Sequence, residues 1–346
     1  MSGLAIKLWG LVAAIGVVLA ACQPAAAPPP SSSPTQAASQ PTAAAPVALK
    51  VSYSNVIADN LPEWMAYESG IFKQHGLDVE LTNIASSNGI AALLAGQVQV
   101  AQLGGSEVLS AAANGGDLMI IGNVGAVYPF VFMVPADITS MDQLRGKAIG
   151  VSNVGSSSDI ATRVMLRKVG LDPNHDVTIV AVGSLEQRMA ALTNGAIQGG
   201  LAQPPDQLAL QDKGFHVLYD LAAEKLPSAN TAITVQRSWL NANRDVAQRY
   251  VDSIVEAIAR SRSDKDLALK VLAKYLKNDD QRALQTTYDF FVGQVTPTYP
   301  TTSTDQFADV IAQLSPQNDK IASFDLTKLL DPSFVQSAID RHLGGS

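Results

Sequence analysis

Short apolar runs and amphipathic stretches alternate through the middle of the chain, which is typical of strands and helices in turn. We expect the first strands at Val47–Tyr53, Gly76–Thr82, Val98–Leu103, Leu118–Gly122 and Ala126–Val134. After Pro135 a second series is expected at Lys147–Val151, Val177–Ala181, Ile197–Leu201 and His216–Tyr219, and one more strand begins at Thr231. Strands that alternate with helices predict an α/β fold with mostly parallel sheets.

The pattern changes near Asn243, where a long amphipathic helix is expected to begin. Val246, Tyr250, Ile254 and Ile258 make its apolar face. Further helices are expected at about 266–276, 280–291, 304–314 and 333–342. The C-terminal part is therefore predicted to be a helical tail.

The first 22 residues carry a different pattern, in which Lys7 precedes the apolar run Leu8–Leu19 of 12 residues. Such a run is too short to span a bilayer comfortably and fits the core of a signal peptide. It ends in Leu19-Ala20-Ala21-Cys22, which resembles the lipobox of bacterial lipoproteins, so Cys22 is expected to be lipidated. An ordinary signal peptide that ends near a cysteine is the alternative.

Residues 23–46 contain 7 Pro, 8 Ala and no charge. This composition cannot build a core and predicts a tether. Together with the lipid anchor, it would hold the body of the protein at a membrane on the extracytoplasmic side.

Composition excludes several classes of function. The 346 residues carry a net charge of −7 with scattered Lys and Arg, which argues against a nucleic-acid partner. Cys22 is the single cysteine and the four histidines are far apart, so no metal site is expected. The chain lacks the G-x-S-x-G, Walker A, G-x-G-x-x-G and H-E-x-x-H motifs, so we expect neither an enzyme nor a cofactor.

A Gly/Ser-rich turn, Asn153–Asp159, lies between an expected strand and an expected helix. The unpaired N–H groups and the dipole at a helix start suit an anionic or strongly polar small molecule. Ser156 with Asp159 three positions later also forms a capping box, which would explain both residues without a ligand. The turn alone leaves both interpretations open.

An internal repeat favours a ligand site. Residues 91–101 and 190–200 share the pattern A-A-L-x-x-G-x-[VI]-Q-x-[AG], each a helix end, a glycine and a strand. Chance similarity is the alternative to two lobes built from one unit. Ligands of open α/β sheets bind beyond the carboxyl ends of the strands. Two facing lobes would then place four turns around one cleft: Ser54–Asn60, Ser86–Asn88, Gly105–Glu107 and Asn153–Ser158.

Four stretches carry a family resemblance: Ala66–Phe72, Gly76–Glu80, Leu94–Val98 and Asp142–Val151. With them the chain, over roughly residues 47–235, resembles the nitrate/sulfonate/taurine and thiamine-precursor group of solute-binding lipoproteins that serve ABC importers. The resemblance implies a two-lobed periplasmic-binding-protein-like fold of type II. Lobe one would comprise residues 47–134 and 228–346, and lobe two residues 135–227. Gln99 and Gln198 depart from the family, where an acidic residue is frequent, and we expect their role to be structural.

By analogy with the family, the ligand-binding residues are Asn55, Asn60, Trp64, Ser86, Ser87, Ser106, Glu107, Tyr128, Ser156, Ser157 and Gln203. The two aromatic residues would stack on an organic part of the ligand or, alternatively, pack in the core. Glu107 would repel an anion but could hold a cationic or N–H-bearing ring; alternatively its charge simply favours the first turn of its helix. No Arg or Lys lies in these turns, so an organic molecule with polar ends is favoured over a bare anion such as nitrate.

The resemblance implies a function in uptake. The protein would capture a small organic molecule, sulfonate- or carboxylate-like or pyrimidine-like, in the interlobe cleft and deliver it to an ABC permease and its ATPase. A lipid-anchored sensing module would share nearly the same sequence and stays open as an alternative, and a secreted enzyme is a weaker one.

Overall fold

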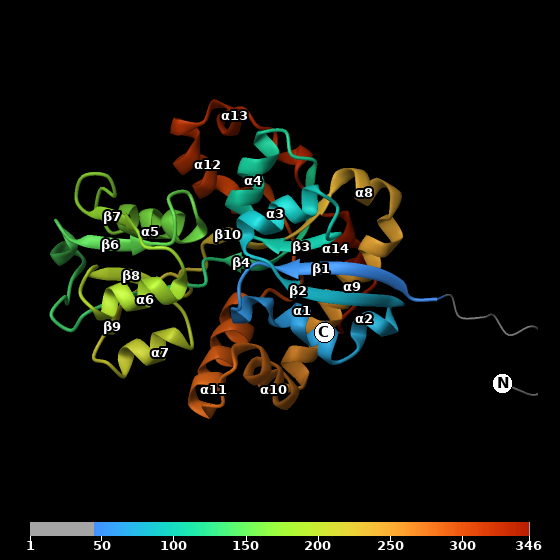
Figure 1. Ribbon diagram of the computed structural model, residues 1–346, viewed down its shortest axis with the longest axis horizontal. Helices are drawn as coiled ribbons and strands as arrows, with labels where there is room; N and C mark the ends of the chain where they lie inside the picture. Colours follow the sequence, from blue (N-terminus) through green and yellow to red (C-terminus); the bar gives the residue numbers. More distant parts are fainter. Residues whose placement is uncertain (1–44, 346) are drawn as a thin grey trace, which may run out of the picture. The chain divides into compact units, whose positions relative to one another are not determined.

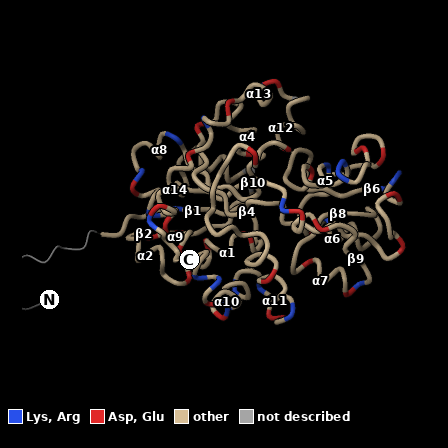
Figure 2. The backbone as a smooth tube through the Cα atoms, turned by 180° about the vertical axis from the view of Figure 1, so that it is seen from behind, with Lys and Arg blue, Asp and Glu red and all other residues tan. Residues whose placement is uncertain are grey.

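The computed structural model describes residues 45–345, apart from the side chains of Ser86, Ser87 and Gln317. The expected signal peptide, the lipidation site at Cys22 and nearly all of the tether lie outside these residues. Basic and acidic residues are interspersed along the described chain (Figure 2). Within residues 45–345, no helix is both long and apolar enough to cross a membrane.

The first sheet, sheet A, has the strand order β2-β1-β3-β10-β4 (Figure 1). Its strands are β1 (Val47–Tyr53), β2 (Leu77–Asn83), β3 (Val100–Leu103), β4 (Leu118–Val127) and β10 (Pro227–Gln236). β1 runs parallel to β2 and β3, with Val51 opposite Leu81 on one side and Val100 on the other. β10 is antiparallel to both β3 and β4.

The second sheet, sheet B, has the order β7-β6-β8-β5-β9. Its strands are β5 (Val131–Val134), β6 (Ala148–Val151), β7 (Thr178–Ala181), β8 (Gly199–Ala202) and β9 (His216–Asp220). β6 is parallel to β7 and β8, whereas β5 is antiparallel to β8 and β9. Each sheet thus places one antiparallel strand in its fourth position, which confirms the α/β class and the repeated architecture expected from the sequence.

The chain passes between the two sheets twice. The first passage is the segment 128–130 between β4 and β5, and the second is 221–226 between β9 and β10. The expectation of one continuous strand over Ala126–Val134 was wrong, because Pro129 has no N–H for a strand ladder and β4 and β5 join different sheets. The first passage accordingly precedes Pro135, the boundary expected from the sequence.

Helices connect the parallel strands in both sheets, and their ranges follow the expected alternation. In chain order they are α1 (Leu61–Glu68), α2 (Ile71–Gln74), α3 (Ser86–Leu94), α4 (Gly105–Ala113), α5 (Ser157–Lys168), α6 (Leu185–Thr193) and α7 (Asp206–Gln211).

The C-terminal part is helical, as the sequence indicated. It comprises α8 (Arg237–Ala242), α9 (Arg244–Ser263), α10 (Lys265–Leu276), α11 (Gln281–Phe290), α12 (Ala308–Leu314), α13 (Asp319–Ala322) and α14 (Ser333–Asp340). The predicted apolar face of α9 is buried: Tyr250, Ile254 and Ile258 are all 0% exposed. Aliphatic and aromatic burial on this scale is the main stabilising term for the helix, since its isolated propensity is modest.

The internal repeat occupies equivalent places in the two sheets. In one copy α3 ends, Gly96 turns the chain with a φ of +70°, and β3 follows beside β1. In the other copy α6 ends, Gly195 turns the chain with a φ of +79°, and β8 follows beside β6. Glycine adopts this left-handed conformation without strain, which explains why both copies keep it.

Candidate functional site

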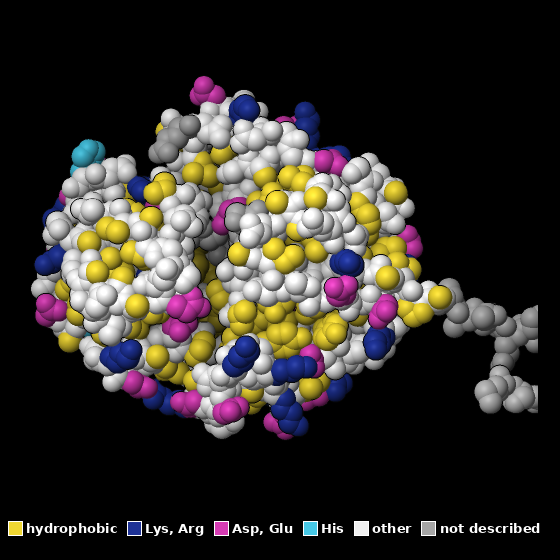
Figure 3. All heavy atoms as spheres, viewed as in Figure 1, with side chains coloured by type: hydrophobic (Ala, Val, Ile, Leu, Met, Phe, Trp, Pro, Cys, Tyr) yellow, Lys and Arg dark blue, Asp and Glu magenta, His cyan; other side chains and the backbone are white. Residues whose placement is uncertain are grey.

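Most of the predicted site residues lie at the carboxyl ends of parallel strands, where open α/β sheets bind ligands. In sheet A the segments that follow β1 and β3 carry them, and in sheet B the segments that follow β6 and β8. Figure 3 shows a furrow on the face that it presents, between the part that carries β5–β9 and the part that carries β1–β3. We take these strand ends as the candidate site.

A buried polar network follows β1. Asn60, 2% exposed, donates from Nδ2 to Asp59 Oδ1 at 2.9 Å and to the backbone oxygen of Asn55 at 2.9 Å. Asp59 Oδ2 accepts a 2.6 Å hydrogen bond from the Thr231 hydroxyl on β10. Burial raises the pKa of Asp59 to about 6 although these hydrogen bonds oppose the change. The side chain of Asn55 is exposed, whereas Asn60 Oδ1 is buried and finds no partner within residues 45–345.

A second buried acid, Glu63, lies one turn further along, and the sequence analysis missed it. Tyr250 on α9 donates a 2.6 Å hydrogen bond to Glu63 Oε1, and Gln102 on β3 donates to the same phenol oxygen at 3.5 Å. Burial, together with the nearby charge of Asp59, raises the pKa of Glu63 to about 8, so Glu63 is mostly protonated at neutral pH. In the sequence, the only feature that pointed to this buried acid was a glutamate in the otherwise apolar first turn of a predicted helix.

Trp64 and Tyr128 pack in the core. Trp64 is 0% exposed, and its ring stacks on Tyr275 with centroids 4.5 Å apart and meets Tyr53 edge-on at 5.7 Å. Tyr128, 1% exposed, lies in the first passage between the sheets and donates from its hydroxyl to Asp309 Oδ2 at 3.2 Å. Burial, with the charge of Asp309, raises the pKa of Tyr128. Both aromatic side chains are therefore part of the core, which was the alternative to stacking on a ligand.

Ser106 and Glu107 form the first turn of α4. The Ser106 hydroxyl, which is buried, donates to Glu107 Oε2 at 2.7 Å. The carboxylate folds back over Gly104, so closely that a Cβ on that glycine would overlap it. A negative charge is favoured at this position by the helix dipole, so the structure shows the helix-start role of Glu107 directly.

The turn before α5 is a helix cap. Ser156 accepts from the backbone N–H of Asp159 at 3.4 Å, and Asp159 Oδ2 in return accepts from the N–H of Gly155 at 2.8 Å. Asp159 also pairs with Arg163 through a 2.7 Å contact. The capping interpretation of Ser156 is therefore confirmed. Ser157 is partly exposed and its hydroxyl makes no hydrogen bond with the described part of the chain, so it stays a candidate ligand donor.

Gln203 follows β8 directly and is 2% exposed, and its Oε1 has no partner among the described residues. Ser86 and Ser87 open α3, but their side chains lie outside what the structure describes. The structure thus places Gln203 at the carboxyl edge of sheet B and the two serines at the helix that follows β2.

The same edge of sheet B holds a buried arginine that the sequence analysis missed. Arg188 on α6 is 3% exposed; its Nε donates to the Leu201 carbonyl at 2.8 Å and its Nη1 to Ser152 Oγ at 2.9 Å. Its aliphatic stem lies over Gly150 and Gly200, where a Cβ would come within 3.5 Å and 3.3 Å of it. This cation comes from a helix and not from one of the predicted turns; in the sequence, only the glycines at the neighbouring strand positions pointed to it.

Burial lowers the pKa of Arg188 to about 10, so the guanidinium remains charged at neutral pH. The charges of Asp206 and Glu186 act in the opposite direction. Neither acid reaches it: within residues 45–345 no carboxylate oxygen lies within 4.0 Å of Arg188. A buried, unpaired cation at the carboxyl edge of a parallel sheet is suited to bind an anion.

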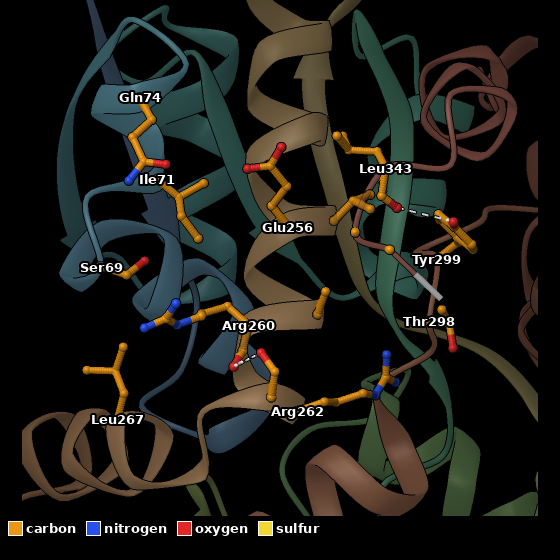
Figure 4. Close-up of a pocket in the computed structure, with 15 residues that line it drawn as sticks. Ser69, Ile71, Gln74, Glu256, Arg260, Arg262, Leu267, Thr298, Tyr299 and Leu343 are labelled. Atoms are coloured by element: carbon orange, nitrogen blue, oxygen red, sulfur yellow. Dashed lines mark hydrogen bonds between the residues drawn. The ribbon is translucent and has the colours of Figure 1, made fainter.

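A cavity of about 920 Å³ lies elsewhere, between α2, α9 and the C-terminal residues, and none of the predicted site residues lines it. Figure 4 shows Arg260 and Arg262 leaving α9 in different directions around it. Two of its charged groups pair with residues outside the lining: Arg260 contacts Asp264 at 2.6 Å, and Glu256 contacts His75 at 3.1 Å. The described residues contain no cluster of three His, Cys, Asp or Glu side chains able to hold a metal ion.

Comparison with known families identifies residues 58–265 as a match to the model described as NMT1/THI5 like. Among curated proteins, the chain is 22% identical over 209 residues to YtlA of Bacillus subtilis, whose name describes it as a binding protein. That match covers 57% of this chain and 60% of YtlA, so the chain spans less than two thirds of its relative.

Several solved structures share the fold. The periplasmic aliphatic sulphonate-binding protein SsuA of Escherichia coli superposes with a TM-score of 0.63, at 21% identity, over 84% of this chain and 91% of SsuA. The periplasmic nitrate-binding protein NrtA of Synechocystis PCC 6803 gives 0.65, at 15% identity, over 86% and 89%. A DszB variant in complex with biphenyl-2-sulfinic acid gives 0.61, at 20% identity, over 85% and 99%. At these low identities, the similarity to the three solved structures shows a shared fold.

Proposed function

The chain belongs to the NMT1/THI5-like family, and from that premise we propose that it is the solute-binding component of an ABC importer. It captures a small organic molecule with a polar or anionic end between the regions of sheet A and sheet B, which act as two lobes. The observation that carries this proposal is the repeated strand arrangement of the two sheets, joined by two passages and bearing polar residues at their carboxyl ends.

The chemistry of the strand ends supports an organic ligand. Ser157, Gln203 and Arg188 supply polar groups in sheet B, and the network of Asp59 and Asn60 supplies them in sheet A. Two exposed apolar side chains, Val56 at 48% and Val154 at 66%, lie in the segments that follow β1 and β6. Binding sites for small organic molecules typically combine an apolar lining with a few oriented polar groups.

The structural neighbours support the same class. SsuA and NrtA are named for an aliphatic sulphonate and nitrate, and DszB was crystallised with a sulfinic acid. We extend only the shared chemistry, a small oxyanion group, to this chain. Binding of an organic oxyanion also fits the charge on Arg188.

Delivery requires that the permease recognise a closed form of the protein. A ligand that converts a mostly open population to a mostly closed one must favour the closed state by about 5.5 kcal/mol. Charge-assisted hydrogen bonds contribute about 1.5–3 kcal/mol each, so a few contacts made only in the closed state are enough. We include in the proposal that Cys22 carries the lipid anchor and that the protein is extracytoplasmic.

A thermal-shift panel on the full-length protein in detergent tests the proposal. The panel holds alkanesulfonates, taurine, nitrate, small carboxylates and pyrimidines. A ligand at 100 times its dissociation constant stabilises the folded state by about 2.7 kcal/mol, which raises Tm visibly. A saturable shift with one class supports the proposal; no shift with any class contradicts the importer assignment. A binding protein encoded beside a histidine kinase instead of a permease would favour the sensing alternative.

A further inference from the structure

We infer that the guanidinium of Arg188 binds the anionic group of the ligand at the carboxyl edge of sheet B, so that the ligand class is an organic sulfonate or carboxylate. This inference rests on the proposed function and narrows it, because a binding protein for a neutral pyrimidine would need no such cation.

The donors of Arg188 are only partly used. A guanidinium presents five N–H groups. Nε donates to the Leu201 carbonyl and Nη1 to Ser152 Oγ, while Nη2 makes no hydrogen bond with any residue in the 45–345 range. Arginine is almost never this deeply buried without a paired acid, because an unpaired charge loses its hydration. The free edge of the guanidinium is therefore open to an anionic partner that residues 45–345 do not supply.

The fold holds the guanidinium in place. The stem of Arg188 packs over Gly150 on β6 and Gly200 on β8, and a Cβ at Gly200 would press on it at 3.3 Å. Its two hydrogen bonds go to groups at the carboxyl ends of the same two strands. A fork fixed in this way can meet two oxygens of one carboxylate or sulfonate with parallel N–H···O bonds.

Neighbouring groups reinforce the site without filling it. Ser152 accepts from Arg188, and its own hydroxyl proton has no acceptor in the part of the chain that the structure describes. It is therefore free to donate to a further ligand oxygen. Glu186, the acid on the same helix, is engaged by the Ser184 hydroxyl at 2.6 Å, and Asp206 begins α7 beyond salt-bridge distance.

Arg262 provides a matched control inside the same chain. It too has no carboxylate within 4.0 Å among the described residues, burial lowers its pKa, and its Nη2 donates to the Thr296 carbonyl at 2.8 Å. It lines the 920 Å³ cavity beside α9, where Figure 4 shows it. If an anion binds in that cavity instead, Arg262 and not Arg188 will control its affinity.

The experiment is a calorimetric titration of the full-length protein and two variants, Arg188→Met and Arg262→Met. The probes are butanesulfonate, benzoate and, as a neutral match for the first, butanesulfonamide. Far-UV circular dichroism and thermal melting first establish that each variant is folded. Arg188→Lys is added because it keeps the positive charge but loses the paired guanidinium donors. It serves as the second variant if Arg188→Met proves to be misfolded.

We expect Arg188→Met to weaken binding of the anionic probe by about 10- to 100-fold, with Arg188→Lys intermediate and Arg262→Met unchanged. Equal affinity of Arg188→Met and the original protein for the anion overturns the inference, as does loss of binding in Arg262→Met alone. Saturable binding of the neutral butanesulfonamide, with neither anion bound, overturns the inference but leaves the proposed function standing. Binding of no probe at all contradicts both.

Discussion

Gln99 and Gln198 make the same pair of hydrogen bonds in the two sheets. Gln99 Oε1 accepts from the N–H of Lys50 at 2.9 Å and its Nε2 donates to the Gly96 carbonyl at 3.3 Å. Gln198 Oε1 accepts from the N–H of Ala148 at 3.1 Å and its Nε2 donates to the Gly195 carbonyl at 2.9 Å. Each amide therefore closes the glycine turn and ties it to the neighbouring strand, β1 in one sheet and β6 in the other. Their structural role, expected from the sequence, is confirmed.

Replacing either glutamine by alanine should lower the free energy of unfolding by about 1 kcal/mol, since a typical intramolecular hydrogen bond contributes about 0.5–1.5 kcal/mol. Replacement by glutamate keeps the acceptor and loses only the donor, so it should cost less than alanine. Urea unfolding of Gln99→Ala, Gln198→Ala and the two glutamate variants measures this. Glutamate variants less stable than the alanine variants would contradict this order and would indicate that the carboxylate is repelled by the glycine carbonyl.

The buried Glu63 should make stability depend on pH. Its pKa is raised from 4.5 to about 8, so the folded state holds a proton that the unfolded state releases. Stability is therefore full below the unfolded pKa and is lost as pH rises, by about 1.4 kcal/mol per pH unit for one group, until the pH passes the folded pKa. Asp59, with a pKa raised to about 6, adds to the loss over the lower part of this range.

Glu63→Gln keeps the oxygen that accepts from Tyr250 but cannot ionise. We expect its unfolding free energy to fall less steeply than that of the original protein between about pH 6 and 8. Glu80→Gln is the control, because the Glu80 side chain is 67% exposed. Chemical denaturation across this pH range decides the matter, and parallel curves for the original protein and Glu63→Gln would mean that Glu63 does not carry the dependence.

Gly200→Ala should weaken anion binding without touching the ligand. The added methyl group would lie 3.3 Å from Cγ and Cδ of Arg188 and must displace the stem. We expect butanesulfonate to bind several-fold more weakly, with little change for butanesulfonamide. Gly293→Ala, which meets no atom within 4 Å, controls for the general effect of adding a methyl group. Equal anion affinity in the two variants would indicate that the glycine does not position the arginine.

Cys22→Ser tests the proposed anchor. The lipidated protein should partition into the detergent phase of a phase-separating detergent, because two acyl chains give stable membrane attachment. The serine variant should move to the aqueous phase, whereas Ser31→Ala in the tether should not. Detergent-phase recovery of Cys22→Ser equal to that of the original protein would contradict lipidation at this cysteine.

The alternation of apolar runs predicted most of the fold. Strands buried on both faces are continuously apolar, and helices buried on one face have apolar residues at a regular spacing. This pattern could not separate β4 from β5, since both are apolar and only Pro129 marks the change of sheet. The helix cap at Ser156 was equally readable, because capping is decided by residues three positions apart. Such local relationships are visible in a sequence.

The site was less predictable for a physical reason. Glu63, Gln102 and Tyr250 come from three distant segments, and only the tertiary fold brings them together. The position and hydrogen bonds of Arg188 likewise depend on Gly150, Ser152 and Leu201, which lie on other elements. In the sequence it is one polar residue on an amphipathic helix. Trp64 shows the converse, because an aromatic side chain near a cleft and one in a core have the same local pattern.

The most direct test of the account is the distance between the two strand edges with and without ligand. Val56→Cys and Val154→Cys, both exposed, place spin labels after β1 and β6 in a Cys22→Ser background that leaves no other cysteine. Double electron–electron resonance is recorded without ligand and with saturating butanesulfonate. If the two sheet regions close around the ligand, butanesulfonate shifts the distribution to shorter distances. A distribution unchanged by a ligand that calorimetry shows to be bound would contradict closure of the two sheet regions around it.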